Sequence, residues 1–117
     1  MNIVKFEDVI AWQRAKELSL YLYRLLQPCR DYGFRDQLQR ASVSIMNNVA
    51  EGFERRSNRE LMNFLYIAKG SCGEVRSMLY LALKLGYISN EEYSKCYNYC
   101  LEISRLLAGF IKSLAIN

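Results

Sequence analysis

Apolar residues recur at intervals of three and four over most of this 117-residue chain, which is the spacing of residues on one face of an α-helix. The first run extends from about Asp8 to Gln27 and stops at Pro28, because proline lacks the backbone N–H that a helix interior needs. A second run begins near Arg35 and fades at residues 54–56. These two runs predict two helices.

Two further runs each open with a Ser-x-x-Glu capping box, which satisfies backbone N–H groups at a helix start. Ser57 and Glu60 precede a run that ends at Gly86, and Ser89 and Glu92 precede a run that extends nearly to the last residue. The last run follows heptad steps at Tyr93, Cys96, Cys100, Ile103, Leu107, Phe110 and Leu114. With no useful strand-like alternation, the pattern predicts one all-α domain over residues 1–117, an antiparallel up-down-up-down four-helix bundle.

The second and third runs carry small and charged residues inside predicted helices. If the chain folds back near Arg56, residues whose numbers sum to about 114 lie opposite one another, which pairs Ser44 with Gly70, Val43 with Ser71 and Ala41 with Gly73. Small residues facing small residues allow two helices to approach closely, so these glycines are predicted to be structural. The same register predicts an ion pair between Arg40 and Glu74.

Glu51 lies one turn from Arg55, where an i,i+4 pair is favourable, and opposite Asn63 in the same register. An orienting or subunit-contact role is favoured, with ligand binding second and catalysis last. Because the chain contains no histidine, a general acid at Glu51 would lack a usual partner. No serine-nucleophile or phosphate-loop motif is present either, so the sequence favours a protein that is not an enzyme and has no catalytic or cofactor-binding residues.

Four cysteines, Cys29, Cys72, Cys96 and Cys100, show no C-x-x-C spacing. Cys96 and Cys100 lie one helical turn apart, but two thiolates without histidine make a poor metal site. Burial as small apolar residues is favoured, and no metal site is predicted. The start MNIVKFED does not resemble a secretory signal, and no window reaches the roughly 20 apolar residues of a membrane span. A cytoplasmic protein with no membrane association is therefore expected.

Sixteen Lys and Arg residues against twelve Asp and Glu residues leave a net charge of +4, a mild excess. Arg55, Arg56 and Arg59 crowd the connection between the second and third helices, while Lys69 and Arg76 lie two turns apart on the third. These five are the candidate phosphate contacts, because cations that neutralise phosphates supply most nucleic-acid affinity. A solvated helix end is an equally weighted explanation of the arginine cluster.

Nine tyrosines exceed what one small core needs. Tyrosine suits subunit interfaces and also stacks on unpaired bases. The interface role is favoured for Tyr21, Tyr66 and Tyr80.

Four segments resemble a known bacterial family: FEDVIAWQRA, QLQRASVSIMNNVAEG, NFLYIAKGSCGE and LKLGYIS. The chain resembles the four helix bundle proteins that include those encoded in intervening sequences of 23S rRNA genes, and is similar to accessory variability proteins of diversity-generating retroelements. Met46 and Asn47 depart from the family's usual Pro or Ala, and Gly73 is an extra glycine. The resemblance implies a ring-like homopentamer associated with structured RNA or with a nucleic-acid-handling partner, without catalytic chemistry.

Two function classes follow from these observations, and a third is disfavoured. The first is an oligomeric basic bundle that binds structured RNA or another nucleic acid, with Arg40, Glu51, Gly70, Ser71 and Glu74 in structural or subunit-contact roles. The second is an interaction scaffold that docks a protein partner such as a reverse transcriptase. The disfavoured third is a small-molecule enzyme that uses Glu51.

Overall fold

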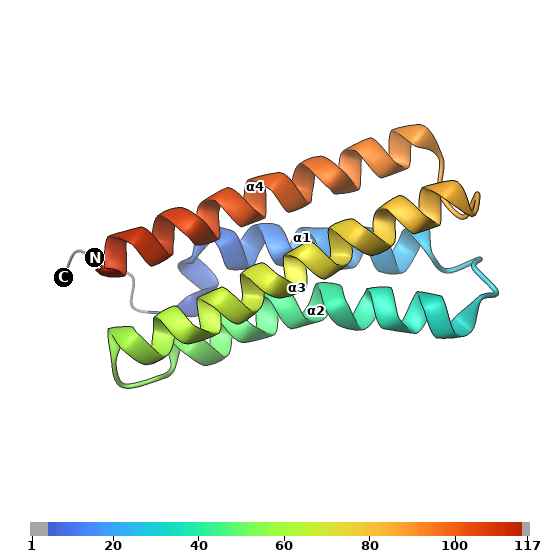
Figure 1. Ribbon diagram of the computed structural model, residues 1–117. Helices are drawn as coiled ribbons and strands as arrows, with labels where there is room; N and C mark the ends of the chain where they lie inside the picture. The colour runs from blue at the N-terminus through green and yellow to red at the C-terminus, as the bar shows by residue number, and fades with distance from the viewer. Residues whose placement is uncertain (1–4, 116–117) are drawn as a thin grey trace.

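The computed structural model describes residues 5–115 and shows four long helices with short connections (Figure 1). A short 3₁₀ helix, η1 (Phe6–Asp8), precedes the helices α1 (Ile10–Leu25), α2 (Tyr32–Phe53), α3 (Asn58–Lys84) and α4 (Asn90–Ala115). Successive helices run in opposite directions (Figure 1). The predicted all-α antiparallel four-helix bundle is confirmed.

Each helix packs against its neighbours in chain order, and α4 closes the bundle by packing on α1. The bundle measures 46 × 20 × 19 Å along its principal axes. The apolar stripes predicted from the sequence meet in one continuous core along its length, which includes Leu18, Ile45, Leu65, Leu79 and Ile103. Burial of these stripes holds the helices together, because isolated helices are only marginally stable in water.

Helix ends follow local capping chemistry. Ser89 and Glu92 form the full reciprocal box, since the Glu92 N–H donates to Ser89 Oγ at 3.1 Å and the Ser89 N–H donates to Glu92 Oε1 at 2.8 Å. At α3, the Glu60 N–H donates to Ser57 Oγ, but the Glu60 carboxylate accepts from the N–H of Arg56. Both predicted helix starts are confirmed. At α3, however, the carboxylate of Glu60 bonds to the backbone of Arg56 and not to that of Ser57.

Two other helix boundaries differ from the predicted ones. Helix α2 begins at Tyr32, before the predicted start near Arg35, because Asp31 caps it by accepting the Phe34 N–H at 3.3 Å. Helix α1 begins at Ile10 because the chain before it forms the separate 3₁₀ turn. The Tyr87 hydroxyl also donates to Asp31 Oδ2 at 2.7 Å, which ties the α1–α2 connection to the α3–α4 connection.

The glycine that is crowded between α2 and α3 is not one of those predicted. A Cβ atom added to Gly52 would lie 2.7 Å from Phe64 Cβ, whereas one added to Gly70 or Gly73 would meet nothing within 4 Å. The prediction that Gly70 and Gly73 bring α2 and α3 together is therefore wrong, because both lie on the exposed side of α3.

The predicted hairpin register is correct only to within a few residues. Ser44 Oγ lies 3.0 Å from Ser71 Oγ, so Ser71 faces Ser44 rather than Val43. Glu74 accepts a hydrogen bond of 3.4 Å from Gln37 Nε2. The predicted Arg40–Glu74 ion pair is wrong, because the actual register places Gln37 beside the carboxylate.

Candidate functional site

The α2–α3 turn holds three of the predicted cationic residues, all of them exposed. Arg55 Nη2 lies 2.7 Å from Glu51 Oε2, which confirms the predicted i,i+4 pairing. The same guanidinium lies 4.7 Å from the centre of the Phe64 ring. Arg55 is thus held by two contacts within the subunit, one of them its ion pair with Glu51.

Arg56 and Arg59 differ from Arg55. Neither side chain forms an ion pair or a cation–π contact within residues 5–115. The nearby carboxylate of Glu60 instead accepts a hydrogen bond from the backbone N–H of Arg56. The turn therefore presents two guanidinium groups to solvent without carboxylate partners, beside the exposed Glu54.

Lys69 and Arg76, which were predicted together, have different surroundings. Lys69 is exposed and lines a groove between α3 and α4. Arg76 is half-buried, and its guanidinium lies 5.8 Å from the centre of the Tyr97 ring. Its Nε atom has no hydrogen-bond partner among residues 5–115. Arg76 is thus partly engaged by α4, while the Lys69 ammonium is available to a ligand.

The α3/α4 groove has a volume of about 320 Å³, within the roughly 300–1,000 Å³ typical of small-ligand pockets. Its lining residues are Tyr66, Lys69, Ala108, Ile111, Lys112 and Ala115. Lys112 was not among the predicted candidates. The sequence could have indicated it through charge distribution, because α4 carries no acidic residue after Glu102 but still contains Arg105 and Lys112.

Other surface hollows have a different charge. One on α4 is lined by Lys95, Asn98, Tyr99 and Glu102, and another on η1 and α1 includes the carboxylates of Glu7 and Glu17. Each of these hollows combines a lysine with at least one carboxylate. The α3/α4 groove differs because none of its lining residues is acidic.

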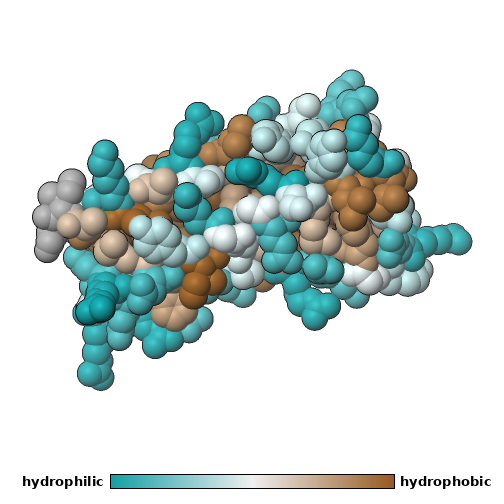
Figure 2. Space-filling model, in the orientation of Figure 1, coloured by the Kyte–Doolittle hydropathy of each residue, from teal (hydrophilic) through white to brown (hydrophobic). Residues whose placement is uncertain are grey.

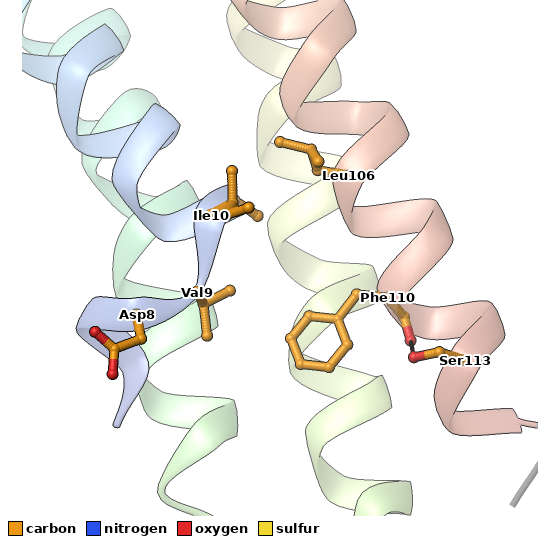
Figure 3. Close-up of a pocket in the computed structure, with 7 residues that line it drawn as sticks. Asp8, Val9, Ile10, Leu106, Phe110 and Ser113 are labelled. Atoms are coloured by element: carbon orange, nitrogen blue, oxygen red, sulfur yellow. Dashed lines mark hydrogen bonds between the residues drawn. The ribbon is translucent and has the colours of Figure 1, made fainter. Parts of the chain in front are cut away.

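A further groove of about 270 Å³ lies between the start of α1 and the C-terminal turns of α4 (Figure 3). Val9, Ile10, Leu106 and Phe110 give it apolar walls, and Figure 3 shows the Asp8 carboxylate directed away from Phe110. Ser113 Oγ donates to the carbonyl of Phe110 at 2.7 Å. The walls therefore offer no converging set of acid, base and nucleophile.

The outer face of α3 exposes large apolar side chains. Tyr66, Ile67, Tyr80 and Leu81 are each about half exposed, and Gly70 and Gly73 lie between them along the helix. Brown apolar surface interrupts the teal surface on the side of the molecule viewed in Figure 2. Tyr21 differs, because it is half-buried with Lys95 Nζ 4.4 Å from its ring centre.

The predicted burial of Cys96 and Cys100 is confirmed, whereas Cys29 is only partly buried. Cys72, Cys96 and Cys100 are buried, and Cys72 Sγ donates to the carbonyl of Cys100 at 3.2 Å. Burial raises the pKa of Cys96 to about 12, so its thiol stays protonated at neutral pH and is a poor nucleophile. Within residues 5–115, no three His, Cys, Asp or Glu side chains are grouped to hold a metal ion.

None of the helices in the described part of the chain combines enough length and apolarity to cross a lipid bilayer. The fold and its surface sites define a small, mildly basic four-helix-bundle protein. A family model described as 23S rRNA-intervening sequence protein matches residues 7–109. The chain belongs to this family, as the resemblance of its four segments predicted.

A solved structure supports the same assignment. A protein of unknown function from the S23 ribosomal protein family of Bacteroides thetaiotaomicron VPI-5482 is 26% identical, with a TM-score of 0.82. The match covers 87% of this chain and 98% of that one. No curated protein matches the sequence. Neither the family description nor the name of the similar structure describes an enzyme.

Proposed function

We propose that this protein is a non-enzymatic, cytoplasmic bundle that assembles with copies of itself and binds structured RNA. The observation that carries the proposal is the pair of exposed guanidinium groups on the α2–α3 turn, Arg56 and Arg59, which have no carboxylate partner in the described chain. Arginine matches phosphate geometry with two parallel hydrogen bonds. The turn is therefore a suitable place for phosphate contacts.

The family makes RNA the first ligand to test. Its model is named for an intervening sequence of 23S rRNA, and the similar Bacteroides structure belongs to a family named for ribosomal protein S23. A net charge of +4 is modest for one subunit. Repeating the same cationic turn around an oligomer would pool weak phosphate contacts, because linked sites raise the effective local concentration.

The proposed surface for self-association is the part of the outer face of α3 that carries Ile67, Gly70, Gly73, Tyr80 and Leu81, while Tyr66 borders α4 and lines the α3/α4 groove. Each glycine inside a helix costs roughly 0.5–1 kcal/mol relative to alanine. Gly70 and Gly73 incur this cost without relieving any crowding within the subunit. A second helix packed on this face, against Ile67, Tyr80 and Leu81, would use the missing side chains for a close approach. A homopentamer is the proposed stoichiometry.

A salt titration tests the proposal. Fluorescence anisotropy would follow a labelled RNA hairpin binding to the protein, with the assembly state measured at the same concentrations. Replacing Arg56 and Arg59 by Gln should weaken binding at least tenfold. It should also lower the slope of log affinity against log salt concentration by the amount that corresponds to about two phosphate contacts. Adding Arg55→Gln should have little further effect, because Arg55 is already paired with Glu51.

A matched control removes the same charge elsewhere. Arg24 and Arg30 are exposed and lie near the α1–α2 connection, at the other end of the bundle. Replacing both by Gln should leave hairpin affinity within about twofold of the original protein. Equal losses in both double variants would show that net charge alone, and not the turn, carries binding.

Docking of a protein partner, such as a reverse transcriptase, is the second candidate function. The exposed apolar side chains of α3 favour it, since exposed apolar patches mark interaction sites. An intact oligomer that binds no hairpin at low salt would refute RNA binding and leave this candidate. A fully monomeric protein at all concentrations would refute self-association.

A further inference from the structure

We propose that the α3/α4 groove holds one unpaired nucleotide of a bound RNA, with the base stacked on Tyr66 and flanking phosphates on Lys69 and Lys112. This inference rests on the proposed function and specifies the form of RNA recognised. The three side chains line the same groove, from two helices that lie side by side (Figure 1). The site lies on the α3–α4 seam, with Tyr66 two helical turns beyond Arg59 along α3.

The Tyr66 ring is unoccupied by the protein's own side chains. It is 57% exposed and makes no ring, cation–π or hydrogen-bond contact within residues 5–115. Tyr80 is similarly exposed, but Lys84 Nζ lies 5.5 Å from its ring centre, and Tyr21 is covered by Lys95. A base stacking on Tyr66 therefore displaces no internal partner.

The charge of the groove selects an anionic ligand. Within residues 5–115, the ammonium groups of Lys69 and Lys112 have no carboxylate partner, and none of the residues that line the groove is acidic. Arg105 lies two helical turns before Lys112 and adds a third exposed cation to this side of α4. A nucleotide supplies both complementary parts, since it carries a planar base and a phosphate on each side.

The groove floor also suits a flat ligand. Ala108 and Ala115 lie one above the other on α4, seven residues apart, and their small side chains leave space beside the Tyr66 ring. Ile111 adds an apolar contact between them. The volume of about 320 Å³ accommodates a base without displacing core residues.

This geometry distinguishes unpaired from paired RNA. In a duplex both faces of a base are covered by its neighbours, and recognition by stacking requires a base to leave that arrangement. Base–aromatic stacking tolerates every base, because each has a π face. The groove should thus favour loops and single strands without strong sequence preference.

The test compares a labelled oligouridylate with a blunt RNA duplex, both measured by fluorescence anisotropy. Tyr66→Ala should weaken oligouridylate binding about tenfold and leave duplex binding unchanged, because it removes one stacked base. Tyr66→Phe should restore affinity, since the ring is kept. Replacing Lys69 and Lys112 by Gln should lower the slope of log affinity against log salt concentration for oligouridylate by about 1.4, because each phosphate contact on a single strand contributes about 0.7.

Matched controls remove the same groups outside the groove. Tyr23→Ala removes an exposed tyrosine of α1, and Lys16→Gln with Lys95→Gln removes two exposed lysines. Neither control should change oligouridylate affinity more than about twofold. Equal losses in control and groove variants would overturn the inference.

The remaining outcomes separate this inference from the proposed function. If the hairpin still binds through Arg56 and Arg59 while all groove variants bind oligouridylate normally, the inference fails and the proposed function stands. If groove variants lose oligouridylate binding while the arginine variants bind as before, the groove is supported and the role of the turn fails. If Tyr66→Ala changes only the assembly state, Tyr66 is a subunit contact and the inference is wrong. Absence of all RNA binding overturns both.

Discussion

The α2–α3 hairpin contains glycines in two opposite settings. Gly52 is buried against α3, where an added Cβ would lie 2.7 Å from Phe64 Cβ, while Gly70 and Gly73 are exposed with open space beside them. The first glycine is required by packing within the subunit. The other two have no such requirement within the subunit, and this difference is the reason for proposing the outer face of α3 as a self-association surface.

The largest expected effect comes from adding a side chain at Gly52, the glycine that is buried against α3. Gly52→Ala should lower the free energy of unfolding by about 2 kcal/mol, because overpacking costs roughly 1–3 kcal/mol and better helix propensity returns less than that. Phe64 Cβ is close to its backbone, so α3 itself has to move. Urea denaturation measures the change, and unaltered stability would show that the hairpin contact is loose.

Adding side chains at the exposed glycines, Gly70 and Gly73, should stabilise the subunit instead of destabilising it. Gly70→Ala with Gly73→Ala should raise the free energy of unfolding of the dissociated subunit by roughly 1–2 kcal/mol, because helix propensity improves. The same methyl groups should weaken self-association about tenfold if a second helix packs there. Sedimentation velocity across a concentration series measures assembly, and an unchanged association constant would contradict the proposed interface.

The smallest effects test the register between the two helices. Alanine variants at Ser44 and Ser71 should show a coupling free energy of about 0.5–1 kcal/mol in a double-mutant cycle, because their hydroxyl groups share a hydrogen bond of 3.0 Å. Alanine variants at Arg40 and Glu74 should be additive, since the structure does not pair them. Coupling at Arg40 and Glu74 instead would restore the register predicted from the sequence.

Local features of the fold were predictable from the sequence because they depend on residues close together in the chain. The capping boxes at Ser57 and Ser89 and the Glu51–Arg55 pair each involve groups within one helical turn. The early start of α2 was missed because the Asp31 cap lies before the apolar pattern begins. An aspartate three residues before Phe34 was the available signal.

The candidate site was predicted only in part. Residue type and clustering identified Arg56, Arg59 and Lys69, which are exposed and have no carboxylate partner in the described part of the chain. Lys112 was missed because it is far from Lys69 in the sequence and comes near it only through the packing of α4 on α3. The covering of Tyr97 by Arg76 likewise depends on that packing.

The sequence by itself determined the number, order and boundaries of the helices within a few residues, because apolar periodicity and capping act over one or two turns. The tertiary structure alone decided which glycine faces a neighbouring helix, which charges are paired and which side chains share a groove. The physical reason is rotational, since moving one position along a helix turns a side chain by about 100°. A shift of one residue in the register between α2 and α3 changes the apolar core little. It nevertheless places Ser71 opposite Ser44, where the sequence predicted Gly70.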